Sequence, residues 1–238
     1  MSESAGPDKI LVVSAHPDDV DFGASGSVAT WTNGGIEVAY CIVTDGSAGS
    51  ADPGVDPDEL RRTRQDEQRK AAAEVGVTQV HFLGYRDGAL EVTLGLRKDI
   101  ARIIRTVRPA RVVCQSPERN WDRIRASHPD HLAAGEATLQ AVYPDARNPY
   151  AYPELLAEGL EPHAVDEVWL MASPRATQAV DITETIDRNV AALRCHVSQL
   201  VDPGRVEEMM REWGAANAAA LGLARGRLAE AFQVVDTR

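Results

Sequence analysis

The sequence predicts an α/β fold, a three-layer α/β/α Rossmann-like domain with a mainly parallel sheet. Three observations lead to this prediction. Short runs rich in Val, Ile and Leu recur along the chain, segments with helical periodicity separate most of them, and glycines or prolines mark the junctions. Strands and helices that alternate in this way form right-handed βαβ units with parallel strands.

Five apolar runs are the expected strands, because each has the length and composition of a strand buried on both faces of a sheet. They span residues 10–14, 37–43, 79–83, 111–114 and 165–171. Cys41 and Cys114 fall inside two of these runs, Cys195 lies far from both, and no C-x-x-C spacing occurs. We therefore expect buried free thiols.

Six helices are expected, and capping or breaking residues mark most of their ends. They span residues 24–32, 58–75, 94–107, a segment that begins at Pro129, and about 181–200 and 205–223. Glycines at 34, 35 and 76 are C-cap signals, and proline suits the first helical position. We expect the last two helices to pack on a single domain of residues 1–238.

Two segments are candidates for contact with a ligand, although neither carries a pattern that identifies one. They are residues 47–58 and residues 143–163. The second contains four prolines and interleaved tyrosines, which is typical of a long surface loop.

Length and charge limit the classes of partner. A chain of 238 residues fits one α/β domain, and a net charge of −11 argues against a nucleic-acid partner. The first nine residues lack the apolar and basic regions of a signal peptide, and no apolar run approaches the length of a membrane span. We expect a cytoplasmic protein with no membrane partner, and the oligomeric state stays open, a homo-oligomer included.

The motif Ala15-His-Pro-Asp-Asp19 directly follows the first expected strand. Ligands bind at the carboxyl ends of strands in open α/β sheets, and imidazole and carboxylate groups can hold a metal there. An Asp-Asp pair after proline also makes ordinary turns and helix caps. A second motif, His128-Pro-Asp-His131, repeats the order and favours the metal site.

A hydrolytic zinc site needs about three protein ligands, commonly two His and one carboxylate. His16, Asp19 and His131 supply that set. Asp18, beside the ligands, is the candidate general base. The metal lowers the pKa of its bound water, and Asp18 would take the proton of that water. His128 could donate a proton or stabilise an oxyanion, with a helix cap as its alternative role.

These two motifs resemble the PIG-L family of zinc-dependent deacetylases, also called LmbE-like. Further matches follow in order along nearly the whole chain: Val43-Thr-Asp-Gly46, Arg64-x-x-Glu67, Gly84-Tyr-Arg-Asp-Gly88 and His196-Val-Ser-Gln199. The resemblance implies a hydrolase that removes an N-acetyl group from an amino sugar or an N-acetylglucosamine conjugate, a small-molecule substrate. It also implies one Zn²⁺ per chain.

The resemblance further implies roles for single residues. His16, Asp19 and His131 are the implied ligands, Asp18 the base and His128 the electrostatic catalyst. Arg64 and Asp87 are implied to lie near the substrate, where a guanidinium and a carboxylate suit sugar hydroxyls. For these two, a salt-bridged surface group is the alternative.

Two positions depart from the family pattern. Val20 stands where the family usually has Glu, with Asp21 next, and Ala126 stands where some members have a tyrosine that helps to hold the oxyanion. Neither position is a ligand or the base, so we expect the chemistry to survive. Arg123, Arg125 or a loop tyrosine could replace the missing tyrosine.

Other functions fit less well. An amidase acting on a thiol conjugate of an amino-sugar cofactor would use the same water attack and stays open, as do iron(II) and cobalt(II) in place of zinc. A non-catalytic relative that only binds a ligand is disfavoured, because all five core residues are present. The turn after the first strand lacks G-x-G-x-x-G, which argues against a dinucleotide site, and no G-x-S-x-G appears for a nucleophilic hydrolase.

Overall fold

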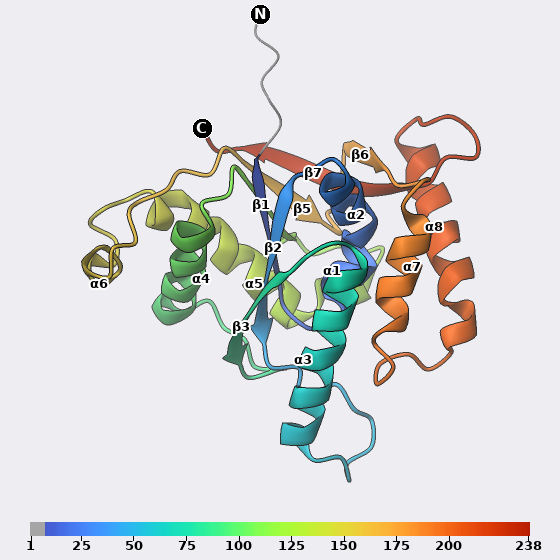
Figure 1. Ribbon diagram of the computed structural model, residues 1–238, viewed down its shortest axis with the longest axis horizontal. Coiled ribbons are helices and arrows are strands. Elements are labelled where there is room, and N and C mark those ends of the chain that lie inside the picture. The colour runs from blue at the N-terminus through green and yellow to red at the C-terminus, as the bar shows by residue number, and fades with distance from the viewer. Residues whose placement is uncertain (1–7) are drawn as a thin grey trace, which may run out of the picture.

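The computed structural model describes residues 8–238 and has the expected three-layer α/β/α architecture (Figure 1). Its sheet has seven strands in the order β3-β2-β1-β4-β5-β7-β6. The five expected strands pair in parallel: β1 (Lys9–Ser14), β2 (Glu37–Thr44), β3 (Gln79–Tyr85), β4 (Arg111–Gln115) and β5 (Glu167–Met171). The fold class predicted from the sequence is confirmed.

Two antiparallel strands were not predicted. β7 (Ala229–Asp236) pairs with β5 on one side and with β6 (Gln178–Asp181) on the other. The helix expected from residue 181 is therefore wrong at its start. Asp181 ends β6, and its carboxylate accepts hydrogen bonds from the backbone and hydroxyl of Thr183 in the following turn.

Eight α-helices connect the strands among the residues described. They are α1 (Asp19–Gly23), α2 (Ser25–Asn33), α3 (Pro57–Glu74), α4 (Leu94–Val107), α5 (Pro129–Gln140), α6 (Pro153–Ala157), α7 (Ile186–Arg194) and α8 (Val206–Ala220). Three short segments of other helical types are η1 (Ile124–Ser127), η2 (Ala141–Ala146) and η3 (Pro203–Arg205). The expected bounds of α4 and the expected start of α5 are confirmed, and α3 is shifted by one residue.

The helix expected at 24–32 is α2, shifted by one residue, and a short helix that was not predicted, α1, precedes it and begins inside the His-Pro-Asp-Asp motif. The carbonyl of Asp18 accepts hydrogen bonds from the backbone N–H groups of Asp21 and Phe22 and so starts α1. The next helix, α2, has no side-chain cap from its own N-cap residue. Glu230 of β7 supplies one, because its carboxylate accepts from Gly26 N at 2.9 Å and from Ser27 N at 2.7 Å.

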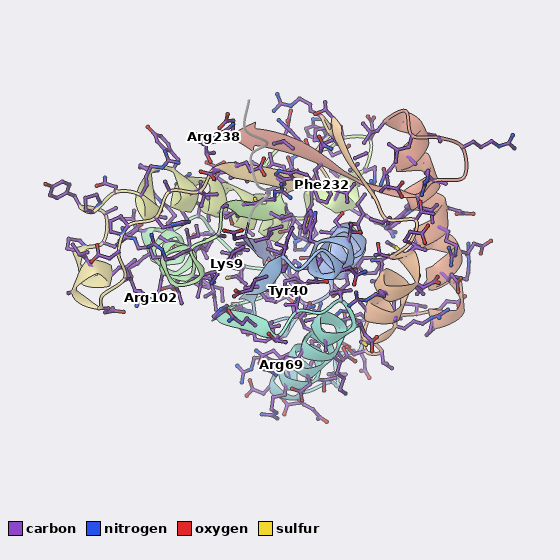
Figure 2. The ribbon with its side chains drawn as sticks, turned by 45° about the horizontal axis from the view of Figure 1, so that its top comes forward. Lys9, Tyr40, Arg69, Arg102, Phe232 and Arg238 are labelled. Atoms are coloured by element: carbon purple, nitrogen blue, oxygen red, sulfur yellow. The ribbon has the colours of Figure 1, made fainter. Side chains whose placement is uncertain are left out.

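Residues along each parallel strand alternate between two buried cores. In β1, Leu11 and Val13 face the core formed with α4 and α5, whereas Ile10 and Val12 face the core formed with α2 and α3. Figure 1 shows these two pairs of helices on opposite sides of the sheet. In Figure 2, Tyr40 lies inside the molecule, while Arg69 and Arg102 point outward from its edge.

The C-terminal helices pack against the helices of one face. α7 contacts both α2 and α3, and α8 lies beside α7 (Figure 1). Val190 and Leu193 of α7 form a buried cluster with Val206 and Met210 of α8. Within residues 8–238, no helix is long and apolar enough to cross a membrane.

The segment 143–163 is more ordered than a simple surface loop, since it contains α6 and part of η2. Arg105 of α4 holds it in place. This guanidinium is 2% exposed and donates to five backbone carbonyls, those of Asp145, Ala146, Asn148, Ala151 and Leu160.

Candidate active site

The first His-Pro-Asp motif lies at the point where the sheet order reverses. From β1 the chain continues to β2 on one side, while β4 lies on the other side of β1. Such a switch point leaves a crevice at the carboxyl ends of the two strands. Gln115, the last residue of β4, reaches across it. Its Oε1 accepts from Ala15 N at 3.1 Å, and its Nε2 donates to Asp19 Oδ2 at 2.9 Å.

Asp18 has a strained backbone, with φ 94° and ψ −28°. Aspartate adopts left-handed conformations more readily than most residues, but such a conformation persists only where neighbours hold it. Here Asp18 N donates to Gln68 Oε1 at 2.8 Å. As a result, the two adjacent carboxylates have different partners: Asp18 contacts Arg64, whereas Asp19 contacts His16 and His131.

The structure brings the three predicted ligands together. Asp19 Oδ2 lies 3.2 Å from His16 Nδ1, and Asp19 Oδ1 lies 3.0 Å from His131 Nε2. His131 is in the first turn of α5, which carries it to the turn after β1. His128 completes a cluster in which the three imidazoles can place one nitrogen each within 4.8 Å of one another.

Hydrogen bonds on the far side of each ring indicate which nitrogen can act as a ligand. His131 Nδ1 faces the carbonyl of Ala126 at 3.3 Å, so this nitrogen carries the proton and Nε2 has the free lone pair. His16 Nε2 faces Asp130 Oδ2 at 3.1 Å and Asp87 Oδ1 at 3.2 Å, which leaves its Nδ1 free. Both free nitrogens are the ones that face Asp19.

The same argument gives His128 a different role. Its Nδ1 accepts a hydrogen bond from Asp130 N at 3.2 Å and caps α5, which is the helix-cap role considered as its alternative. The neutral ring then carries its proton on Nε2, so the remaining nitrogen is a donor and not a ligand. Burial and the nearby His16 lower the pKa of His128, which favours this neutral form.

The electrostatics of the turn separate the two aspartates. Burial raises the pKa of Asp18 to about 7, the charge of Asp19 adds to the shift, and Arg64 opposes it. Burial also opposes ionisation of Asp19, but His131 and His16 hold its pKa well below the usual range. Asp18 can therefore accept and return a proton near neutral pH, whereas Asp19 stays ionised.

Arg64 and Asp87 both lie in the wall of this site. Arg64 Nη2 donates to the carbonyl of Pro17 at 2.7 Å and lies 3.3 Å from Asp18 Oδ2. Asp87 contacts His16 and lies 3.5 Å from Arg64 Nη1. The two side chains are 4% and 8% exposed, so they are ion-paired but are not surface groups. That either one touches the substrate stays a prediction.

Several residues that support the site had no role in the sequence analysis. Asp130 lies inside the second motif, and its carboxylate also accepts from the N–H groups of Gly88 and Leu90. Gln68 and Gln115 carried no sequence signal, because each acts on a partner at least 50 residues away. Only Asp130 could have been found from the sequence, because it is the acidic residue between the two histidines of the second motif.

Behind the turn, a buried network starts from the position after Val20. Val20 packs in the core, while Asp21 accepts from Gln68 Nε2 and pairs with His196 Nε2, both at 2.8 Å. His196, from the last of the motif matches, thus lies in the network behind the site. Through Gln68, this network reaches the backbone of Asp18.

A cavity of about 1090 Å³ opens above Asp19 and His131. Its wall comes from the segment 122–126 and from residues 199–213, on and before α8. Neither expected contact segment, 47–58 or 143–163, lines this cavity, but Ala48 N donates to Asp87 Oδ2 at 3.1 Å in the wall of the site, and contact of either segment with a ligand stays a prediction. Of the candidates for the missing tyrosine, Arg123 and Arg125 line the cavity and the loop tyrosines do not.

Known proteins are similar to this chain in sequence and in architecture. A family model described as PIG-L, GlcNAc-PI de-N-acetylase, matches residues 11–142. A diacetylchitobiose deacetylase from Thermococcus kodakarensis is 34% identical over 191 residues, 80% of this chain and 70% of that protein. A probable N-acetyl-alpha-D-glucosaminyl L-malate deacetylase 2 from Bacillus anthracis is 29% identical over 86% of each chain. A solved structure, N,N'-diacetylchitobiose deacetylase from Pyrococcus horikoshii with its inhibitor MPG, has a TM-score of 0.88 at 28% identity, over 98% of this chain and 85% of that one.

Proposed function

Because the chain belongs to the PIG-L family, we propose that it is a metal-dependent hydrolase that removes the N-acetyl group from an N-acetylglucosamine unit of a small conjugate. Relatives are named for this reaction on diacetylchitobiose and on an N-acetylglucosaminyl malate. The observation that carries the proposal is the convergence of His16, Asp19 and His131 beside a cavity, with Asp18 held next to them on Arg64.

The donor set fits a divalent transition metal, and zinc is the ion that we propose. Two neutral imidazole nitrogens and one carboxylate are a common hydrolytic set. The carboxylate oxygens of Asp19 lie 3.2 Å from His16 Nδ1 and 3.0 Å from His131 Nε2. Two ligand atoms bound to a tetrahedral ion at about 2.0 Å are separated by about 3.3 Å, which is close to these distances.

The charges around His16 support the same fit. Burial opposes a positive charge on this ring, yet Asp19 and Asp87 outweigh it and raise the pKa of His16 to about 11. The surrounding carboxylates thus favour positive charge at this point, whether a proton or a metal ion supplies it. When bound, the metal would lower the pKa of a water and polarise the amide carbonyl.

Each of the remaining roles belongs to the side chains of this protein. Asp18 would take the proton of the attacking water and return it to the nitrogen of the leaving amine. His128 would donate from Nε2 to the oxygen that becomes negative in the transition state. Arg64 would fix the carboxylate of Asp18, and Asp130 and Gln115 would orient His16 and Asp19.

Metal content and acetate release test this function together. Protein purified without chelators should hold about one zinc per chain and release acetate from an N-acetylglucosamine derivative. Asp18→Ala should keep the metal while turnover falls at least about 100-fold, as loss of a general base requires. Absence of stoichiometric metal would contradict the ligand assignment, and near-normal turnover of Asp18→Ala would remove Asp18 from its role.

A substrate panel then distinguishes the remaining choices. It should include N-acetylglucosamine, its inositol and malate conjugates, diacetylchitobiose and a thiol conjugate of an amino-sugar cofactor. Preference for the thiol conjugate would favour the amidase alternative. We further propose a cytoplasmic location and one domain, and sedimentation of the purified protein would determine whether it forms a homo-oligomer.

A further inference from the structure

The cavity beyond the proposed metal site has an apolar wall that the proposed chemistry does not use. Trp213 and Met209 of α8, Leu200 before η3 and Phe22 of α1 contribute to it. The rings of Phe22 and Trp213 have centroids 6.4 Å apart at an angle of 51°. Trp213 is 39% exposed, so part of a large apolar ring faces open space beside the reaction centre.

The volume of the cavity exceeds what a single sugar needs. Clefts that hold a drug-sized ligand measure about 300 to 1,000 Å³, and this one measures about 1090 Å³. One N-acetylated ring next to Asp19 and His131 would leave much of the space empty. The region near Trp213 can therefore hold a second group attached to that ring.

The charges of the wall argue against a strongly anionic second group. Apart from Asp19 and His131, three guanidinium groups and three carboxylates line the cavity: Arg123, Arg125, Arg205, Asp122, Asp202 and Glu212. Two of these cations already have partners. Arg123 lies 5.4 Å from the centre of a Trp213 ring, and Arg205 Nε lies 3.7 Å from Glu208 Oε2.

We propose that Trp213, with Phe22 and Met209, forms a second subsite for an uncharged ring-shaped group with an apolar face, linked to the acetylated amino sugar. This inference rests on the proposed function. The indole would cover the apolar C–H face of the group, while the polar edge of the group would reach the rim of the cavity. The exposed Arg123 side chain is only weakly held over the indole and can move aside.

A second sugar ring and an aryl group share this chemistry, and a matched set of substrates separates them. We would measure kcat/KM for acetate release from methyl N-acetylglucosaminide, diacetylchitobiose, phenyl N-acetylglucosaminide and N-acetylglucosaminyl malate. Trp213→Ala should lower the value by about 10-fold or more for diacetylchitobiose or the phenyl glycoside, as loss of a buried aromatic contact predicts. The methyl glycoside and the malate conjugate should change little. The larger of the two losses identifies the preferred group.

Two variants serve as controls. Trp213→Phe keeps an aromatic face and should restore most of the loss. Trp121→Ala removes another indole, 79% exposed and outside the cavity wall, and should leave all four values unchanged. Thermal unfolding and metal content of each variant confirm that the fold is intact.

Binding provides a readout that does not depend on turnover. In the Asp18→Asn background, calorimetric titration with intact diacetylchitobiose or phenyl glycoside should show weaker binding when Trp213→Ala is added. Equal losses for all four substrates, or a preference for the malate conjugate that Arg123→Ala abolishes, would overturn the subsite. Release of acetate from none of the four would refute the proposed function, and the titration would still decide whether Trp213 binds the second group.

Discussion

Replacing Gln115 by Glu tests how β4 holds the turn that carries two of the proposed ligands. Gln115 is 4% exposed, and its Nε2 donates to Asp19 Oδ2 at 2.9 Å. The substitution keeps the shape of the side chain and leaves Oε1 free to accept from Ala15 N. It replaces the amide donor with a second carboxylate oxygen, which would face the carboxylate of Asp19.

The free-energy cost of placing this second carboxylate beside Asp19 has an upper bound that depends on pH. At 2.9 Å, two negative charges in a medium with an effective dielectric constant of about 20 repel by about 6 kcal/mol. The new Glu can avoid this repulsion by taking up a proton and donating as the amide did. With an ordinary pKa of about 4.3, protonation costs about 4 kcal/mol at pH 7 and only about 1 kcal/mol at pH 5.

The unfolding free energy of the metal-free protein, measured by urea titration, is the appropriate assay, because a bound cation would offset the added negative charge. We expect Gln115→Glu to lower this free energy by up to about 4 kcal/mol at pH 7 and by about 1 kcal/mol at pH 5. Gln140→Glu is the matched control, because Gln140 Nε2 donates to Glu136 on the outside of α5. Equal unfolding free energies of Gln115→Glu and wild type at pH 7, or a loss that grows at lower pH, would refute the reasoning.

Two further predictions concern stability. A Cβ on Gly135 would lie 2.3 Å from the carbonyl oxygen of Gln115, so Gly135→Ala should lower the free energy of unfolding by about 1 to 3 kcal/mol in urea titrations, while Gly95→Ala, with no neighbour closer than 3.7 Å, should have little effect. Burial opposes a charge on His196, but Asp21 raises its pKa above 6.5, so the stabilisation from this pair is complete below pH 6.5 and is lost as the pH rises through the raised pKa. His196→Gln should remove that part of the pH dependence, and an unchanged slope of unfolding free energy between pH 6.5 and 9 would contradict it.

Local patterns account for the parts of the fold that the sequence predicts well. The strands β1 to β5 are continuous apolar runs because both of their faces are buried. α4 begins after a capping threonine and ends before a proline, so residues next to the helix predict both of its ends. β6 and β7 were missed because an antiparallel pair at the edge of a sheet is defined by its partner, about 50 residues away.

The residues of the site also fall into a predictable group and an unpredictable one. Two short motifs contain the proposed ligands and catalytic residues, which spacing and residue type could predict: His16, Asp18, Asp19, His128 and His131. Their supports could not be found in this manner, since Gln115 and Gln68 reach the turn across the fold. The cavity wall was also missed, because packing on both α7 and β7 brings α8 to the site, and the sequence of α8 does not reveal these partners.

The position of β7 has a consequence for the order of events during synthesis on the ribosome. This strand, late in the chain, lies between β5 and β6 and also caps α2 through Glu230. A nascent chain that has emerged only as far as α8 could pair β1 to β5, but the free edge of β5 and the uncapped start of α2 would remain exposed. We expect such chains to be the form most in need of a chaperone, and the turn that carries the proposed ligands, next to α2, to become rigid only when β7 arrives.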